Sequence, residues 1–117
     1  FPPPAPLLYL KKGKPVKYNK LVRDRIPEIL EAKGKKYTVR QIEEGFEKGS
    51  YLRKKLIEET DEFLKCPNIE ELADVQEVLF ALAENMGYQP EHLETFRKEK
   101  AARRGVFKDN WILEEVI

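Results

Sequence analysis

Apolar residues recur at intervals of three and four along much of this chain, a spacing typical of amphipathic helices. The clearest stretch reads IEELADVQEVLFALAENM and predicts a helix over residues 69–86, with Asn68 as its N-cap and Gly87 at its stop. The same pattern, with proline and glycine as punctuation, predicts three further helices, over residues 25–33, residues 50–65 with room for an earlier start, and residues 90–104.

Outside these helices the pattern predicts short extended segments. Residues 1–6 contain four prolines and cannot be helical, and the apolar residues that follow favour a short edge strand or hairpin within residues 7–18. Asp24 is predicted to be the N-cap of the first helix. Residues 36–42 alternate loosely, which is a weak indication of a strand. The apolar-rich tail, residues 106–117, is expected to pack in an extended form against the helices or a partner subunit.

Length and composition favour one small helical domain. A chain of 117 residues with 41% hydrophobic and 37% charged residues can bury a core, but only a small one. We therefore expect an all-α fold, a small bundle of about four helices in residues 18–117, preceded by an extended arm in residues 1–17. Small helical chains of this kind often complete their core by forming oligomers.

Composition also excludes several classes of protein. The formal net charge of +1 gives no argument for a nucleic-acid partner. Cys66 is the single cysteine, so no internal disulfide can form, and a reducing, cytoplasmic location is expected. No run of 18 apolar residues exists, so no transmembrane helix is expected. The P-loop motif G-x-x-x-x-G-K-[ST] is absent.

Two acidic motifs flank the proline break between the second and third predicted helices. The first reads E-E-x-x-E at Glu58, Glu59 and Glu62, and the second reads E-x-x-D at Glu71 and Asp74. The spacing of three residues places the last two acids of the first motif side by side on one helix, and both acids of the second motif side by side on the next. Two antiparallel helices joined by a short turn would bring these four carboxylates together.

Helical wheels show that the acids border the apolar stripes. At about 100° per residue, Glu59 lies about 20° from Leu52, beside the stripe expected to be buried. Glu71 lies between Val78 and Leu82, within the apolar arc of the third helix. A carboxylate in such a position requires a cation, a hydrogen-bond partner or a raised pKa.

The four carboxylates predict a site for Mg²⁺ or Mn²⁺. The motif E-E-x-x-E alone is common on solvated helices, but a second acidic motif inside an apolar arc makes a metal site much more plausible. Converging carboxylates repel one another without a cation, and hard oxygen ligands suit Mg²⁺ or Mn²⁺ rather than zinc. The expected metal ligands are Glu59, Glu62, Glu71 and Asp74.

Basic residues flank this acidic middle of the chain. Residues 58–77 contain eight acids and one base, whereas residues 11–25 contain seven bases and one acid, and residues 97–104 contain five bases and one acid. An acidic region for metal between basic regions for phosphate suits a nucleoside triphosphate. The alternative is that these bases simply pair with acids of neighbouring helices.

Three blocks of the sequence resemble one known family. They are YNKLVRDRIPEIL at residues 18–30, the paired acidic motifs, and RKEKAARRGVF at residues 97–107. Together these blocks resemble the MazG-like, all-α nucleoside triphosphate pyrophosphohydrolases, in particular the branch labelled phosphoribosyl-ATP pyrophosphohydrolase-like. The resemblance spans about residues 18–113.

The resemblance implies Mg²⁺-dependent cleavage of a nucleotide between its α and β phosphates by a homodimer or homotetramer. By motif position the catalytic acids would be Glu59, as a ligand, and Glu58, as a further ligand or as the group that orients the attacking water. Metal coordination lowers the pKa of water, so no protein nucleophile is required. The phosphate contacts are expected from Lys20, Arg23, Arg25, Arg97, Lys100 and Arg104.

Two other functions are compatible with some of these features. A non-catalytic helical module could use the acidic helices for subunit contacts, or bind nucleotide without turnover. A nucleic-acid binder using the basic N-terminal segment is disfavoured by the near-zero net charge.

Overall fold

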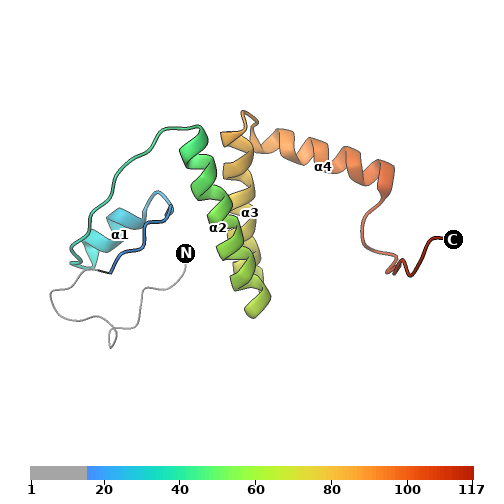
Figure 1. Cartoon of the computed structure of the whole chain (residues 1–117), viewed down its shortest axis with the longest axis horizontal. Coiled ribbons are helices and arrows are strands. Elements are labelled where there is room, and N and C mark those ends of the chain that lie inside the picture. The colour runs from blue at the N-terminus through green and yellow to red at the C-terminus, as the bar shows by residue number, and fades with distance from the viewer. Residues whose placement is uncertain (1–15) are drawn as a thin grey trace.

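The computed structural model describes residues 16–117, and all regular structure in this range is helical (Figure 1). The four helices are α1 (Ile26–Ala32), α2 (Phe46–Lys65), α3 (Ile69–Asn85) and α4 (Pro90–Arg104). The predicted all-α class with four helices is therefore confirmed. No helix between residues 16 and 117 is long and apolar enough to span a membrane.

α2 and α3 form an antiparallel hairpin at the centre of the molecule (Figure 1). The connection from Cys66 to Asn68 is short, and Asn68 caps α3 as predicted. Its Oδ1 accepts a hydrogen bond from the backbone N–H of Glu71 at 3.0 Å, and its Nδ2 donates to the Cys66 carbonyl at 2.9 Å. Because the connection is short, the last turns of α2 lie beside the first turns of α3, and both acidic motifs are at this end.

The other end of the hairpin is held by a close approach of the two helices. A Cβ atom at Gly49 would lie 2.9 Å from Asn85 Oδ1, so only glycine fits here without a shift of its neighbour. Asn85 Nδ2 donates to the Gly45 carbonyl and to the Glu44 carboxylate, each at 3.2 Å. These contacts support the first turn of α2. The helix begins at Phe46, about one turn before residue 50, where the predicted helix begins.

The buried part of the described chain is small and partly charged. Its buried apolar residues are Ile26, Leu52, Val78 and Ala83. The buried residues of α2 follow a single helical stripe: Gly49, Leu52, Lys55 and Glu59. This stripe begins with a small and an apolar residue and ends with a lysine and a glutamate, so the charged end of the hairpin interface is as enclosed as its apolar end.

α4 projects away from the hairpin, and the tail follows it (Figure 1). Helix contacts of α4 are with α3 alone, and none of its residues is buried. Phe107 and Trp111 in the tail are 100% and 88% exposed. The expected packing of residues 106–117 against the helices is therefore wrong within one chain, because α4 carries the tail outward. The Cα radius of gyration is 18.6 Å, against roughly 13 Å for a compact chain of this length.

α1 follows a backbone turn rather than a side-chain cap. The N-cap residue is Arg25, and no side chain makes a cap hydrogen bond. The prediction of Asp24 as the N-cap was wrong because the Ile26 N–H donates to the Arg23 carbonyl at 3.1 Å, so a turn already leads the chain into the helix.

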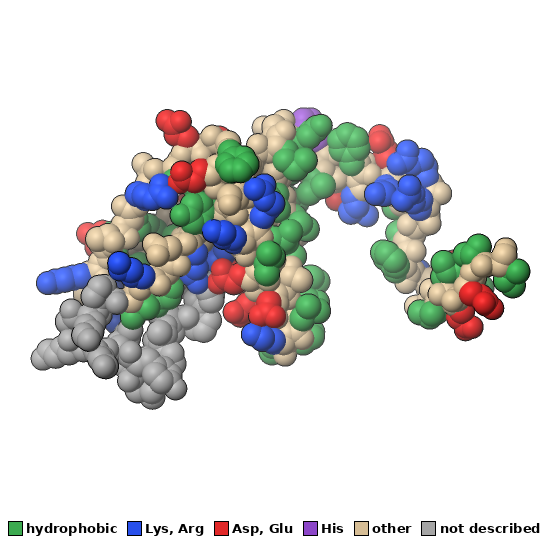
Figure 2. All heavy atoms as spheres, in the orientation of Figure 1, with side chains coloured by type: hydrophobic (Ala, Val, Ile, Leu, Met, Phe, Trp, Pro, Cys, Tyr) green, Lys and Arg blue, Asp and Glu red, His purple; other side chains and the backbone are tan. Residues whose placement is uncertain are grey.

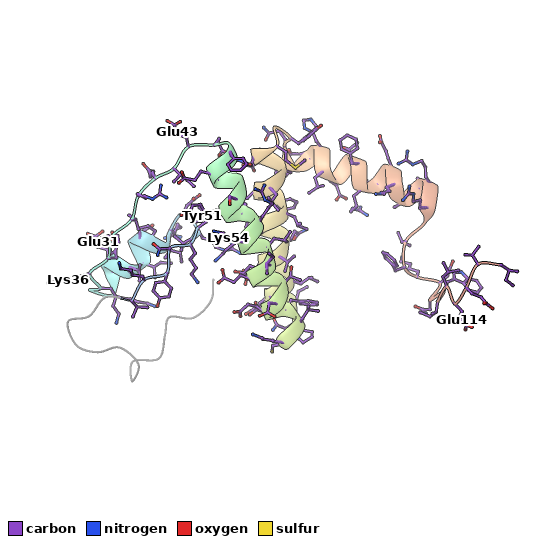
Figure 3. The ribbon with its side chains drawn as sticks, in the orientation of Figure 1. Glu31, Lys36, Glu43, Tyr51, Lys54 and Glu114 are labelled. Atoms are coloured by element: carbon purple, nitrogen blue, oxygen red, sulfur yellow. The ribbon has the colours of Figure 1, made fainter. Side chains whose placement is uncertain are left out.

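The connection from α1 to α2 is extended but is not a strand. Figure 3 shows it with Lys36 and Glu43 labelled. Residues 36–42 were expected to form a strand, but a strand needs a partner for its hydrogen-bonded ladder. Residues 16–117 contain no strand. Arg40 fixes the end of this connection instead, with an ion pair to Glu47 at 2.8 Å and a hydrogen bond to the Tyr51 hydroxyl at 3.4 Å.

The predicted extended arm and the predicted hairpin within residues 7–18 fall mostly outside the described residues. Residues 16–18, which are described, contain no strand.

Candidate metal centre

Three carboxylates meet where α2 and α3 face each other near their connection. Oxygen atoms of Glu59, Glu71 and Asp74 lie within 4.8 Å of one another. Glu59 belongs to α2, whereas the other two acids lie three residues apart in the first turns of α3. The antiparallel hairpin therefore brings together three of the four predicted metal ligands.

Glu59 is the most deeply buried member of this acidic group. It is 2% exposed, which is deeper than the predicted position at the border of the apolar stripe. Lys55, one turn earlier on α2, places its Nζ 3.6 Å from Glu59 Oε1. A buried carboxylate is costly unless it is paired or bound to a metal, and the Lys55 ammonium provides an opposite charge.

Glu71 is affected by burial and by the charges of its acidic neighbours. Partial burial raises the pKa of its carboxyl, and the negative charges of Asp74, Glu62 and Glu59 raise it further. These influences all disfavour the ionised form of Glu71, so a cation held among the carboxylates would act in the opposite direction.

Glu62, the fourth predicted ligand, lies outside the group of three. It is half-buried on α2, one turn beyond Glu59 towards the helix connection. Its charge is nevertheless near enough to raise the pKa of Glu71. Glu62 therefore adds negative charge near the site without belonging to the group of three carboxylates.

Glu58 is paired with two lysines and is not part of the acidic group. Lys20 Nζ lies 3.0 Å from its Oε1, and Lys55 Nζ lies 3.4 Å from its Oε2. Burial alone would raise the pKa of Glu58, but hydrogen bonds and charge from both lysines hold it below its usual range. Glu58 is therefore kept ionised at the edge of the site.

The basic residues before α1 reach this site in two of three predicted cases. Lys20 contacts Glu58, and Arg23 Nη2 donates to Asp74 Oδ1 at 2.6 Å. Arg25 instead pairs with Glu28 of α1 at 3.2 Å. Figure 2 shows acidic and basic side chains gathered at this end of the hairpin.

The predicted phosphate-binding residues of α4 do not reach the acidic group of their own chain. α3 rises about 16 Å between Asp74 and Asn85, and α4 then leads away from its far end (Figure 1). Arg97 pairs locally with Glu94 at 2.6 Å. Arg97, Lys100 and Arg104 are all exposed.

Lys55 was missed by the sequence analysis although it lies at the centre of the ion-pair network. Lysine on a helix is normally solvated, so the residue type did not indicate that Lys55 is buried. Its position in the sequence does indicate burial. Lys55 follows Leu52 by three residues and precedes Glu59 by four, which places all three on one buried stripe.

The donor set of the acidic group fits a hard divalent cation. Three carboxylates supply oxygen atoms only, which suits Mg²⁺ or Mn²⁺ completed by water and phosphate oxygens. Asn68 and the short connection fix the start of α3, while Lys55 and Arg23 supply nearby positive charge.

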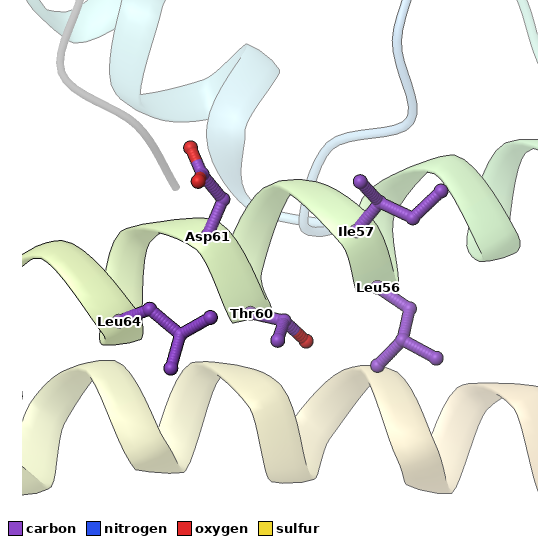
Figure 4. A pocket seen from close by; sticks show the side chains of 5 residues that line it. All are labelled: Leu56, Ile57, Thr60, Asp61 and Leu64. Carbon is purple, nitrogen blue, oxygen red and sulfur yellow. The ribbon is translucent and has the colours of Figure 1, made fainter.

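Two hollows among the described residues lie beside the acidic group rather than on it. One of about 440 Å³ runs along α2 and is lined by Leu56, Ile57, Thr60, Asp61 and Leu64 (Figure 4). Another of about 320 Å³ runs along α3 and is lined by Ile69, Leu72, Ala73, Val75, Gln76 and Leu79. Both are mainly apolar, so they suit protein contact better than phosphate.

Comparison of this sequence and structure with protein-family models, curated proteins and solved structures finds no match.

Proposed function

We propose that this chain is a Mg²⁺-dependent nucleotide pyrophosphohydrolase, which cleaves a nucleoside triphosphate or related nucleotide between the α and β phosphates. The observation that carries the proposal is the convergence of Glu59, Glu71 and Asp74 next to Lys20 and Arg23. Candidate metal ligands and candidate phosphate-binding cations thus occupy one end of the hairpin. The resemblance of the acidic motifs to those of MazG-like pyrophosphohydrolases supports the same function.

In this proposal the chain positions its reactants by charge. Glu59, Glu71 and Asp74 would hold the metal, which when bound lowers the pKa of water and neutralises phosphate charge. The ionised Glu58 carboxylate is suited to orient the attacking water by accepting its hydrogen bond. Lys20, whose Nζ lies 3.0 Å from the Glu58 carboxylate, would supply a positive charge for a phosphate oxygen.

We further propose that the chain works as a homodimer or homotetramer in the cytoplasm, without a nucleic-acid partner. Ile57 and Ile69, on the rims of the two apolar hollows, are 72% and 77% exposed, and the tail is similarly apolar and exposed. Large exposed apolar side chains gathered around such hollows are typical of interaction sites. The cations of α4, including Arg97, could then contact phosphate at the site of a second copy.

The proposed function is tested by measuring pyrophosphate release from a panel of canonical and modified nucleotides with Mg²⁺. Glu71→Gln and Glu59→Gln should lower turnover at least 100-fold, since each removes a charged ligand from the site. Glu77→Gln, an exposed acid on the same helix as Glu71, is the matched control and should keep full activity.

Two results would count against the enzyme. Nucleotide binding without pyrophosphate release anywhere in the panel would favour a non-catalytic nucleotide-binding module. Unchanged activity in Glu59→Gln and Glu71→Gln, with increased stability, would show that the metal ligands are assigned wrongly.

A further inference from the structure

Residues 20–23, which we call the crossing segment, contact both acidic helices. Lys20 Nζ lies 3.0 Å from Glu58 Oε1 on α2, and Arg23 Nη2 lies 2.6 Å from Asp74 Oδ1 on α3. Three residues of extended chain cover about 10 Å, which matches the separation of roughly 8–10 Å between packed helix axes. The crossing segment therefore bridges the hairpin at the level of the acidic group.

The two ends of the crossing segment differ in what they bind. Lys20 binds Glu58, which lies outside the group of converging carboxylates. Arg23 binds Asp74, which is one of the three members of that group. Arg23 therefore uses a carboxylate that a metal ion would also use.

The Arg23–Asp74 ion pair is of a kind that another ion can readily displace. The two side chains are 47% and 26% exposed, and partly exposed ion pairs contribute little net stability. A guanidinium at one oxygen of a carboxylate repels a divalent cation at the other oxygen, because the two positive charges are only a few ångströms apart. A divalent cation held by this group would also contact Glu59 and Glu71, whereas the ion pair of Arg23 is with Asp74.

We propose that Arg23 competes with the divalent cation for Asp74, and that the guanidinium displaced by the cation is then free to bind the phosphates of the nucleotide. This inference rests on the proposed function, since it requires a cation at the acidic group. Coupled binding equilibria are reciprocal, so the cation weakens the Arg23–Asp74 pair by the factor by which Arg23 weakens cation binding.

The test is the affinity of the full chain for Mn²⁺, measured by titration calorimetry without nucleotide in about 0.15 M salt, where the Debye length is about 8 Å. Arg23→Gln should bind Mn²⁺ about three- to tenfold more tightly than the unchanged chain. Arg25→Gln is the matched control, because Arg25 is bound to Glu28 of α1 and its removal frees no member of the group. Its Mn²⁺ affinity should stay within about twofold of the unchanged chain.

Two further measurements separate competition from a structural role. Saturating Mg²⁺ should speed hydrogen exchange of the backbone amides in the crossing segment of the unchanged chain. Arg23→Gln should lose pyrophosphate release while binding Mn²⁺ more tightly, a combination that simple unfolding cannot produce. If circular dichroism shows lost helicity in Arg23→Gln, Arg23→Lys replaces it, with an expected gain in Mn²⁺ affinity of about twofold.

Mn²⁺ binding distinguishes a wrong role for Arg23 from a wrong metal site. Folded Arg23→Gln that binds Mn²⁺ as the unchanged chain does, or more weakly, overturns the competition and leaves the metal site in place. Absence of Mn²⁺ binding by the unchanged chain, or binding that Glu71→Gln does not weaken, overturns the proposed function together with the inference.

Discussion

The α2–α3 hairpin and the α4 region with its tail (residues 90–117) differ in how far they bury their side chains. The hairpin buries Leu52 and, on the same stripe, the charged Lys55 and Glu59. α4 buries nothing, and Trp111 in the tail is 88% exposed. The hairpin thus pairs even its charged groups within one chain, whereas the α4 region presents apolar surface that we expect a second copy to cover.

Truncation of one leucine in each region gives the largest contrast. Leu52→Ala should lower the free energy of unfolding by about 2–4 kcal/mol, because Leu52 is 2% exposed and its loss leaves a cavity. Leu113→Ala in the tail, where the leucine is 80% exposed, should change the stability of the monomer by less than about 0.5 kcal/mol. Urea unfolding at low protein concentration measures both.

The same pair of variants also tests association. Leu113→Ala should shift the light-scattering mass of the protein towards the monomer, whereas Leu52→Ala should not do so while it is folded. Similar unfolding losses in both variants at low concentration would refute the distinction between the two regions.

Adjacent lysines on α2 sharpen the comparison within the hairpin itself. Lys55→Met should destabilise the chain by about 2–3 kcal/mol, because Glu59 stays buried but loses the ammonium next to it. Lys54→Met should change stability by less than about 0.5 kcal/mol, since Lys54 is exposed beside the Tyr51 ring. Thermal unfolding of both variants is the measurement, and equal losses would show that burial of Lys55 is unimportant.

The smallest predicted effect is the pH dependence caused by Glu71. Its pKa is raised in the folded chain, first by partial burial and then by neighbouring acids, so the folded chain binds the proton more readily than the unfolded chain. Stability must therefore fall as pH rises from the ordinary glutamate pKa through the raised value, and it stays reduced above that window. Glu71→Gln should raise the thermal midpoint at neutral pH and should have no such benefit at pH values below the ordinary glutamate pKa.

Glu77→Gln serves as the control for this pH dependence, because Glu77 is exposed on the same helix. Saturating Mg²⁺ should also remove the advantage of Glu71→Gln, since a bound cation favours the ionised carboxylate. A lower midpoint for Glu71→Gln at neutral pH without metal would contradict the assignment.

Features encoded by local spacing could be predicted from the sequence. Asn68 caps α3 because amide side chains at that position accept from the backbone three residues on. The position of Glu59 beside the buried Leu52 followed from helical periodicity, which fixes the angle between the two residues. The meeting of the two acidic motifs followed from the short connection between their helices.

Features set by the path of the chain in space could not be predicted in this way. The distance of Arg97 from the acidic group depends on the direction in which α4 leaves α3, and the residue pattern of either helix does not encode that direction. Residues 36–42 have a strand-like pattern, but a strand also needs a partner, which is a non-local condition. The contacts of Lys20 and Arg23 likewise join segments 38 and 51 residues apart in sequence.

The contacts of Asn85 have a consequence for the order in which the hairpin forms. The first turn of α2 has glycine at its N-cap and again at Gly49, and no side chain caps it, so this turn is weak in isolation. Its carbonyl at Gly45 and the Glu44 carboxylate are bound by Asn85 from the last turn of α3. We therefore expect the start of α2 to become stable only after the end of α3 has docked, and we expect local unfolding of the hairpin to begin at this end.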